Sequence, residues 1–159
     1  MIVDNWHMAD TDKSSDAQAY AQHLSAGNAL VAQAQALATT NFEKARELWQ
    51  AAGREFYLAH RADMDEAEAA FRLAQAWMAE AHALYKEESP NAAVMWANAA
   101  AQSELAFDLE PENGRIAMTA ATCHHFAGHT DASKAWLQIG QHLLPPAPAD
   151  DNERSSAEG

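Results

Sequence analysis

The feature that most constrains the fold of this sequence is its alanine content. Of the 159 residues, 39 are alanine, whereas valine and isoleucine together supply only six. Alanine has the highest intrinsic helix propensity and lets helix axes approach closely, while β-sheets pack on β-branched and aromatic side chains. The sequence therefore predicts an all-α fold, and its length is enough for one domain with a modest core.

The net charge of the chain limits the classes of partner that it can bind. Ten Lys and Arg residues stand against 23 Asp and Glu residues, a formal net charge of −13. Such a surface repels phosphate backbones and anionic membranes, so we expect neither nucleic acid nor membrane as a partner. Cys123 is the only cysteine, which excludes an intramolecular disulfide and is typical of a reducing compartment. No signal-peptide pattern or long apolar run occurs, so the expected location is the cytoplasm.

The two ends differ in composition from the centre. Residues 1–13 are polar and acidic with a few apolar side chains, and residues 145–159 combine three prolines with small and charged residues. We expect a flexible N-terminal arm over 1–13, a helical repeat domain over 14–144 and a disordered acidic tail over 145–159. The arm can support a homodimer contact through its apolar residues Ile2, Val3, Trp6 and Met8.

Capping and breaking residues divide the domain into six predicted helices. The first should end near Thr39–Thr40, the fourth before Pro111, the fifth at Gly128 and the sixth before Pro145. Ser89 is followed by Pro90, a residue favoured at the first helical position. Helix starts are expected at Ser14–Asp16, Asn41, Asp63 or Asp65, Ser89, Asn113 and Asp131.

Alanines recur at corresponding places in these helices. The segment NFEKARELWQAA pairs Ala45 with Trp49 in the pattern of the second helix of a tetratricopeptide repeat, and equivalent alanines follow at Ala93 and Ala132. Their separations are 48 and 39 residues, against about 34 in regular repeats. The spacing favours three irregular tetratricopeptide-like helix pairs in a short curved solenoid, and a plain six-helix bundle is the alternative.

One stretch is more specific than this general pattern. In residues 114–136, Arg115 is followed by the small pair Ala120–Ala121, then by Cys123 and Gly128. This arrangement resembles the last repeat of the class II chaperones of type III secretion, which hold translocator proteins before export. The resemblance implies a cytoplasmic, non-enzymatic chaperone without a cofactor, whose clients are hydrophobic translocator segments.

Residues with catalytic or metal-binding chemistry do not form a recognisable motif. There is no phosphate-binding glycine loop, no HExxH and no cysteine pair. Cys123, His124, His125 and His129 are close in sequence. However, successive helical residues point about 100° apart, so the first three cannot converge on one ion. We therefore expect no enzyme activity and no metal, with Cys123 buried in a structural role and Trp49, Trp77, Trp96 and Trp136 in the core.

The first helix of each pair lines the concave face of a helical-repeat solenoid. In the register above, this face mixes methionine, aromatic and hydrogen-bonding side chains, which suits an extended peptide. Two alternatives remain open, namely that these side chains only pack against neighbouring helices, or that the chain is a general scaffold for another peptide. The candidate groove residues are Leu30, Ala34, Leu37, Gln75, Met78, His82, Tyr85, Arg115, Met118, Thr122, His125 and Phe126.

Overall fold

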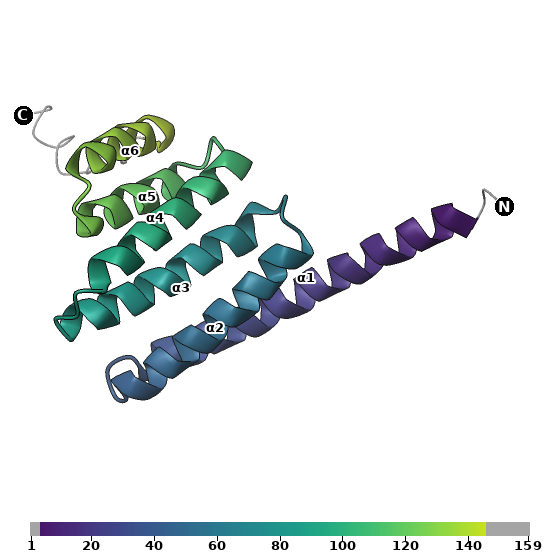
Figure 1. The fold of residues 1–159 in the computed structure, drawn as a ribbon, viewed down its shortest axis with the longest axis horizontal. Helices are drawn as coiled ribbons and strands as arrows, with labels where there is room; N and C mark the ends of the chain where they lie inside the picture. The colour runs from purple at the N-terminus through teal and green to yellow at the C-terminus, as the bar shows by residue number, and fades with distance from the viewer. Residues whose placement is uncertain (1–3, 146–159) are drawn as a thin grey trace, which may run out of the picture.

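The computed structural model describes residues 4–145, with side chains from residue 13 onward. Its fold is all-α, as predicted, with no strand among these residues (Figure 1). The tail over 146–159 and the arm residues Ile2 and Val3 lie outside the described residues, as do the side chains of Trp6 and Met8. The six helices are α1 (Asp4–Leu37), α2 (Phe42–Ala62), α3 (Ala67–Lys86), α4 (Ala92–Leu109), α5 (Gly114–Ala127) and α6 (Thr130–Leu143).

Each helix packs mainly against its neighbours in sequence. The extensive interfaces are α1–α2, α2–α3, α3–α4, α4–α5 and α5–α6, and the one between α2 and α3 is the least extensive. Short connections make successive helices antiparallel, so the chain advances as a stack from α1 to α6 (Figure 1). Each helix therefore lies next to the helices that precede and follow it in the chain.

Several predicted helix ends are confirmed by cap geometry. The side chain of Asn41 accepts a hydrogen bond from the backbone N–H of Lys44 and caps α2. The side chain of Asn113 accepts from Arg115 and caps α5 in the same way. Gly128 ends α5 in the left-handed conformation, with φ of 86°, which a glycine adopts without steric cost.

Other predicted boundaries are wrong. The first helix begins at Asp4 and not at Ser14–Asp16, so the backbone of residues 4–13 is helical, and it ends at Leu37. Since α1 has 34 residues and α2 has 21, the N-terminal part of α1 projects beyond the rest of the molecule (Figure 1). A serine or aspartate in a helical sequence is not a cap when the residues before it also continue the helix.

The predicted starts of α3, α4 and α6 are each displaced by a few residues. Glu66, not Asp63 or Asp65, precedes α3, because the carboxylate of Asp63 accepts from the N–H of Asp65 in the connecting turn. Ser89 likewise accepts from the N–H of Asn91 and closes a turn, so α4 begins at Ala92. The sixth helix begins at Thr130, one residue before the expected Asp131.

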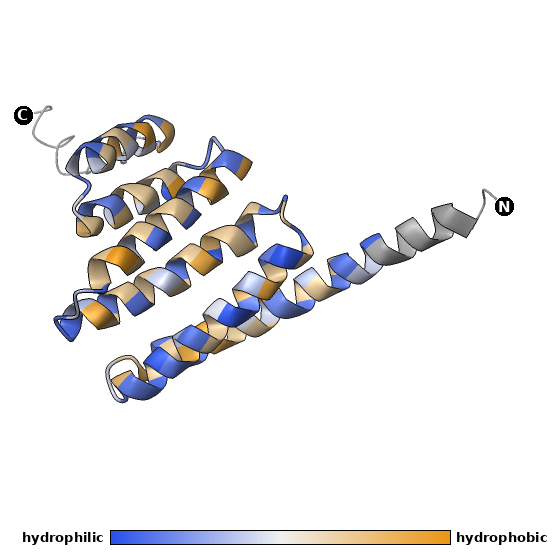
Figure 2. Ribbon diagram, viewed as in Figure 1, coloured by the Kyte–Doolittle hydropathy of each residue, from blue (hydrophilic) through white to orange (hydrophobic). Residues whose placement is uncertain are grey.

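The core consists largely of alanine with a few large side chains between the helices. Phe56, Leu73 and Ile116 are the largest apolar side chains that are fully buried. Figure 2 shows hydrophilic residues at the connections and along α1 and α2, and more apolar residues along α4. Small residues allow close contacts elsewhere, since a Cβ atom on Gly27 would overlap the ring of Phe56. No described helix has both the length and the apolar character that a membrane crossing requires.

Candidate functional site

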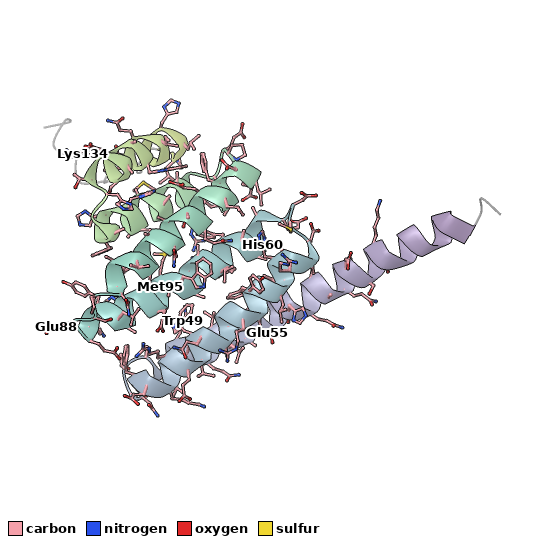
Figure 3. The ribbon with its side chains drawn as sticks, viewed as in Figure 1. Trp49, Glu55, His60, Glu88, Met95 and Lys134 are labelled. Atoms are coloured by element: carbon pink, nitrogen blue, oxygen red, sulfur yellow. The ribbon has the colours of Figure 1, made fainter. Side chains whose placement is uncertain are left out.

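A large apolar cleft opens between α2, α3 and α4, and we call it the α2–α4 cleft. Its volume is about 560 Å³, within the range of ligand-binding pockets. In Figure 3, Trp49 on α2 and Met95 on α4 are labelled at this opening. The lining residues are Trp49, Gln50, Gly53, Arg54, Tyr57 and Leu58 from α2, Leu73, Ala76, Trp77 and Glu80 from α3, and Met95 from α4.

The spacing of residues on α2 explains this lining. Trp49, Gly53 and Tyr57 are four residues apart and lie on one face of the helix. Gly53 approaches α3 closely, because a Cβ atom built on it would lie 3.4 Å from the Cβ of Ala76. The small residues therefore form a floor where the helices meet, while the bulky Trp49 and Tyr57 stand on either side of it.

The floor is part of the core and is supported from behind. Leu73 and Ala76 belong to a buried cluster with Val31, Ala52 and Phe56. The indole rings of Trp49 and Trp77 pack against this same cluster and remain half-buried. These two rings thus have one side in the core and another toward the cleft. Packing of this kind holds the rings in a fixed position before any ligand binds.

One end of the cleft is closed by an ion pair between α2 and α3. The guanidinium of Arg46 donates two hydrogen bonds to Glu80, with Nη2–Oε1 and Nε–Oε2 distances of 2.8 and 3.1 Å. Gln50 donates a further bond of 3.1 Å to Glu80, and Arg46 also pairs with Glu87. The hydrogen bonds from Arg46 lower the pKa of Glu80. The acid in the cleft is therefore ionised and already neutralised by its partner.

The open rim contrasts with this closed end. Tyr57 and Leu58 are 49% and 44% exposed, which leaves their apolar surface available to a ligand. Arg54 is also exposed, and within residues 13–145 no carboxylate lies within ion-pair distance of it. The rim thus offers apolar contacts together with one cation for orientation.

A second, smaller cleft lies on the other side of α3, and we call it the α1–α5 cleft. Its volume is about 290 Å³. It brings together three residues of the predicted groove, Gln75, Met78 and Arg115. The guanidinium of Arg115 lies 5.6 Å from the centre of the Phe71 ring. The remaining lining residues, which the sequence did not indicate, are Val31, Gln35, Trp49, Phe56 and Arg72.

Other residues of the predicted groove make contacts within the fold. Leu30 packs against the core cluster of Phe56. Met118 packs against α6, since a Cβ atom on Gly140 would overlap its sulfur. The ring of Phe126 stacks on Trp96 at 4.7 Å between ring centres.

The rest of the predicted groove is distributed over three helices. His125 makes an edge contact with Phe126, and Thr122 donates to the carbonyl of Met118. Ala34 is fully buried and Leu37 is half-buried on α1, while His82 and Tyr85 are exposed on α3. These side chains line neither cleft.

The sequence did not identify the α2–α4 cleft because its aromatic residues were assigned to the core. Trp96 is buried as predicted, but Trp49, Trp77 and Trp136 are only half-buried. The periodicity of an apolar stripe does not distinguish a buried ring from one that lines an open cleft. The sequence does contain one indication of the cleft. Residues 49, 53 and 57 and residues 50, 54 and 58 form two adjacent stripes on α2, and together these stripes are wider than the contact with a single neighbouring helix requires.

Cys123 has the structural position that was predicted for it. Its side chain is fully buried beside Ala99 and Ala100, and burial raises the pKa of the thiol to about 12. A thiol in this state is a poor nucleophile and a poor metal ligand at neutral pH. The residue therefore contributes packing where α4 meets α5.

Comparisons with known proteins do not identify a family for this chain. No family model matches the sequence, and no curated protein matches it. The function proposed below therefore starts from the α2–α4 cleft, which has the most apolar lining of the clefts among the described residues.

Proposed function

We propose that this protein is a non-enzymatic chaperone that binds an apolar peptide segment in the α2–α4 cleft. The observation that carries the proposal is the cleft itself, a space of about 560 Å³ lined by Trp49, Trp77, Tyr57, Leu58 and Met95. Tryptophan, tyrosine and methionine are the apolar residues enriched in protein interfaces. Their concentration around one opening favours a protein ligand over a reaction centre.

The shape of the cleft favours a client segment with a regular apolar face. The cleft runs beside α2 from Trp49 to Leu58, a rise of about 14 Å at 1.5 Å per residue. A client helix would present two or three large side chains over that length, spaced three or four residues apart. Methionine at one wall can adjust to different client side chains.

The chaperone action requires only occupancy. Covering the apolar face of a client removes the surface through which it aggregates. By its resemblance over residues 114–136, we assign the clients to the hydrophobic translocators of type III secretion, with the cytoplasm as the place of binding. The negative net charge of the chain keeps such a complex soluble and favours clients with basic flanking segments.

Co-expression with candidate translocators tests this proposal, with the amount of soluble client as the readout. Leu58→Asp places a charge at the rim of the cleft and should reduce the recovered complex by about tenfold or more. Leu105→Asp is the matched control, because Leu105 has a similar exposure of 40% but does not line the cleft. If no translocator is retained in solution, the chaperone proposal is wrong. If both variants bind alike, the cleft is not the binding site.

A scaffold for another peptide is the second candidate, and the α1–α5 cleft favours it. Two arginines, Arg72 and Arg115, line that cleft with the amides of Gln35 and Gln75. Guanidinium groups bind carboxylates in fixed geometry, so the ligand would be an acidic peptide. Arg115→Ala should then weaken binding of an acidic peptide while Leu58→Asp leaves it unchanged, and the opposite result favours the chaperone.

A homodimer through the N-terminal region is part of the proposal. Residues 4–13 extend α1 beyond α2, so this end of the helix does not pack against α2. A second copy is a partner that can stabilise this projection. Deletion of residues 1–13 should convert a dimer to a monomer in light scattering, and an unchanged mass would contradict the contact.

A further inference from the structure

The turn between α5 and α6 brings two histidines together. Gly128 adopts the left-handed conformation there. The N–H of His129 donates to the carbonyl of His124 at 2.9 Å, and the N–H of Gly128 donates to that of His125 at 3.1 Å. This is the hydrogen-bond pattern of a helix that ends in a Schellman motif. It reverses the chain so that the side chain of His129 returns to the side of His124.

The two imidazole rings face each other through corresponding nitrogens. The Nδ1 atoms of His124 and His129 are 3.1 Å apart, and the ring centres are 5.3 Å apart. The other nitrogen of His124, Nε2, lies 2.6 Å from the carboxylate of Glu104 on α4. That carboxylate oxygen also accepts a bond of 3.0 Å from the indole of Trp136 on α6. Residues of three helices therefore fix the ring of His124.

We propose that His124 and His129 form an open binding site for a late first-row divalent cation, Cu²⁺ above all. Metal–imidazole bonds are about 2.0–2.1 Å long, so two nitrogens 3.1 Å apart subtend an angle of about 100° at a shared ion. This angle is close to that of adjacent ligands in the square-planar or tetragonal geometry that Cu²⁺ and Ni²⁺ prefer. Cu²⁺ has the highest affinity of the divalent series for nitrogen ligands.

The surroundings of His124 match those of a histidine ligand. Ligating histidines usually donate their second ring N–H to a carboxylate, which fixes the tautomer and leaves the opposite nitrogen free to bind. Glu104 has this position relative to His124. The side chain of His124 is 12% exposed, so the protein holds it in place, while His129 is exposed and accessible to the ion.

The site is open, and solvent completes the coordination. Within the described residues no third histidine, cysteine or carboxylate joins the pair as a ligand, so water occupies the other positions. Without the ion, one N–H is shared between the two Nδ1 atoms, since Nε2 of His124 donates to Glu104. On binding, His129 carries its proton on the solvent-accessible Nε2 instead.

Titration of the metal-free, untagged full chain with Cu²⁺ tests this site. Calorimetry should give one ion per chain, and electron paramagnetic resonance should show two coordinated nitrogens. His129→Ala should weaken binding by about tenfold or more, and Glu104→Gln by about 10- to 100-fold. His125→Ala is the matched control, since His125 lies in the same last turn of α5 but outside the pair.

Two results would overturn the proposal. The first is an equal affinity of the wild type and the His129→Ala protein for Cu²⁺. The second is a loss in His125→Ala as large as that in His129→Ala. Because His129 is an exposed residue after the end of α5, its substitution leaves the packing intact, and an unchanged circular dichroism spectrum verifies this. The site is separate from both clefts, so client binding by Leu58 variants does not bear on it.

Discussion

The interface between α4 and α5 and the interface between α2 and α3 are both based on small residues, but only the first closes completely. Where α4 meets α5, Ala99, Ala100 and Cys123 are fully buried in one cluster with Trp96. Where α2 meets α3, Gly53 approaches Ala76 in a similar way. Here, however, the neighbouring Trp49 and Trp77 are only half-buried, whereas Trp96 beside Ala99 and Ala100 is buried.

The tryptophans account for the difference. Trp49 precedes Gly53 by one turn and Trp77 follows Ala76 directly, and both rings pack against the core while they line the opening. Because these bulky rings are not covered by a further helix, a cleft of about 560 Å³ stays open beside them. One alanine-rich chain thus has both a closed helix interface and an open apolar cleft.

The largest expected effect concerns the support beneath the open interface. Phe56→Ala should lower the free energy of unfolding by about 3–5 kcal/mol, because the ring is fully buried against Gly27 and its loss leaves a cavity. Phe42→Ala in the same helix is the control. Phe42 is exposed and contacts Lys86 through its ring face, so about 1 kcal/mol is expected. Urea denaturation measures both, and equal losses would contradict a floor supported by Phe56.

The closed interface should resist enlargement. Ala99→Leu adds three carbon atoms where α4 meets α5 and should cost about 1–3 kcal/mol of unfolding free energy. Ala101→Leu on the same helix lies on the exposed face and should change stability by less than about 0.5 kcal/mol. Thermal unfolding of the two variants gives the comparison. If Ala99→Leu lowers the stability no more than Ala101→Leu does, the α4–α5 interface contains space that the burial of Ala99 does not indicate.

The all-α fold and most helix positions could be predicted from the sequence because their causes are local. Alanine content determines the helical class, and Asn41, Asn113 and Gly128 act on the backbone within four residues of themselves. The wrongly predicted helix starts near Ser89 and Asp63 have local causes too. Each of these side chains can accept a hydrogen bond either as a helix cap or within a turn, and in the structure it does so within a turn. The sequence alone does not show which turn is more stable.

The candidate site could not be predicted in the same way because it depends on contacts between helices. The register placed Gln75, Met78 and Arg115 together, and they do line one cleft. It also placed Met118 and Phe126 in that groove, whereas they pack on α6 and Trp96. Periodicity gives the face of a helix that is apolar, but not the crossing angle that decides which apolar residues stay accessible.

The ion pair at the closed end of the cleft should have a smaller, pH-dependent effect. Glu80→Gln should cost about 1 kcal/mol at pH 7, since it removes the charge from two hydrogen bonds with Arg46. The pKa of Glu80 is lowered in the folded protein, so this stability is present above about pH 4.5 and is lost as the pH falls through the folded value. Glu47→Gln is the control, because the one ion pair of Glu47 within the described residues is with the exposed Lys44. A wild type and Glu80→Gln protein of equal stability at both pH 7 and pH 4 would show that the pair does not hold α2 to α3.

The smallest expected effect belongs to His60, near the end of α2 that lies away from the ion pair. This ring is buried, its Nδ1 has no hydrogen-bond partner within the described residues, and burial lowers its pKa. The unfolded chain then binds more protons than the folded chain just below pH 6.5, so stability decreases as the pH falls through that range. We expect a loss of less than about 1 kcal/mol between pH 7 and pH 5.5. His60→Leu should remove most of that loss, while His142→Leu, at an exposed position of α6, should retain it. If both variants have the same pH profile of stability, the acid-sensitive group is not His60.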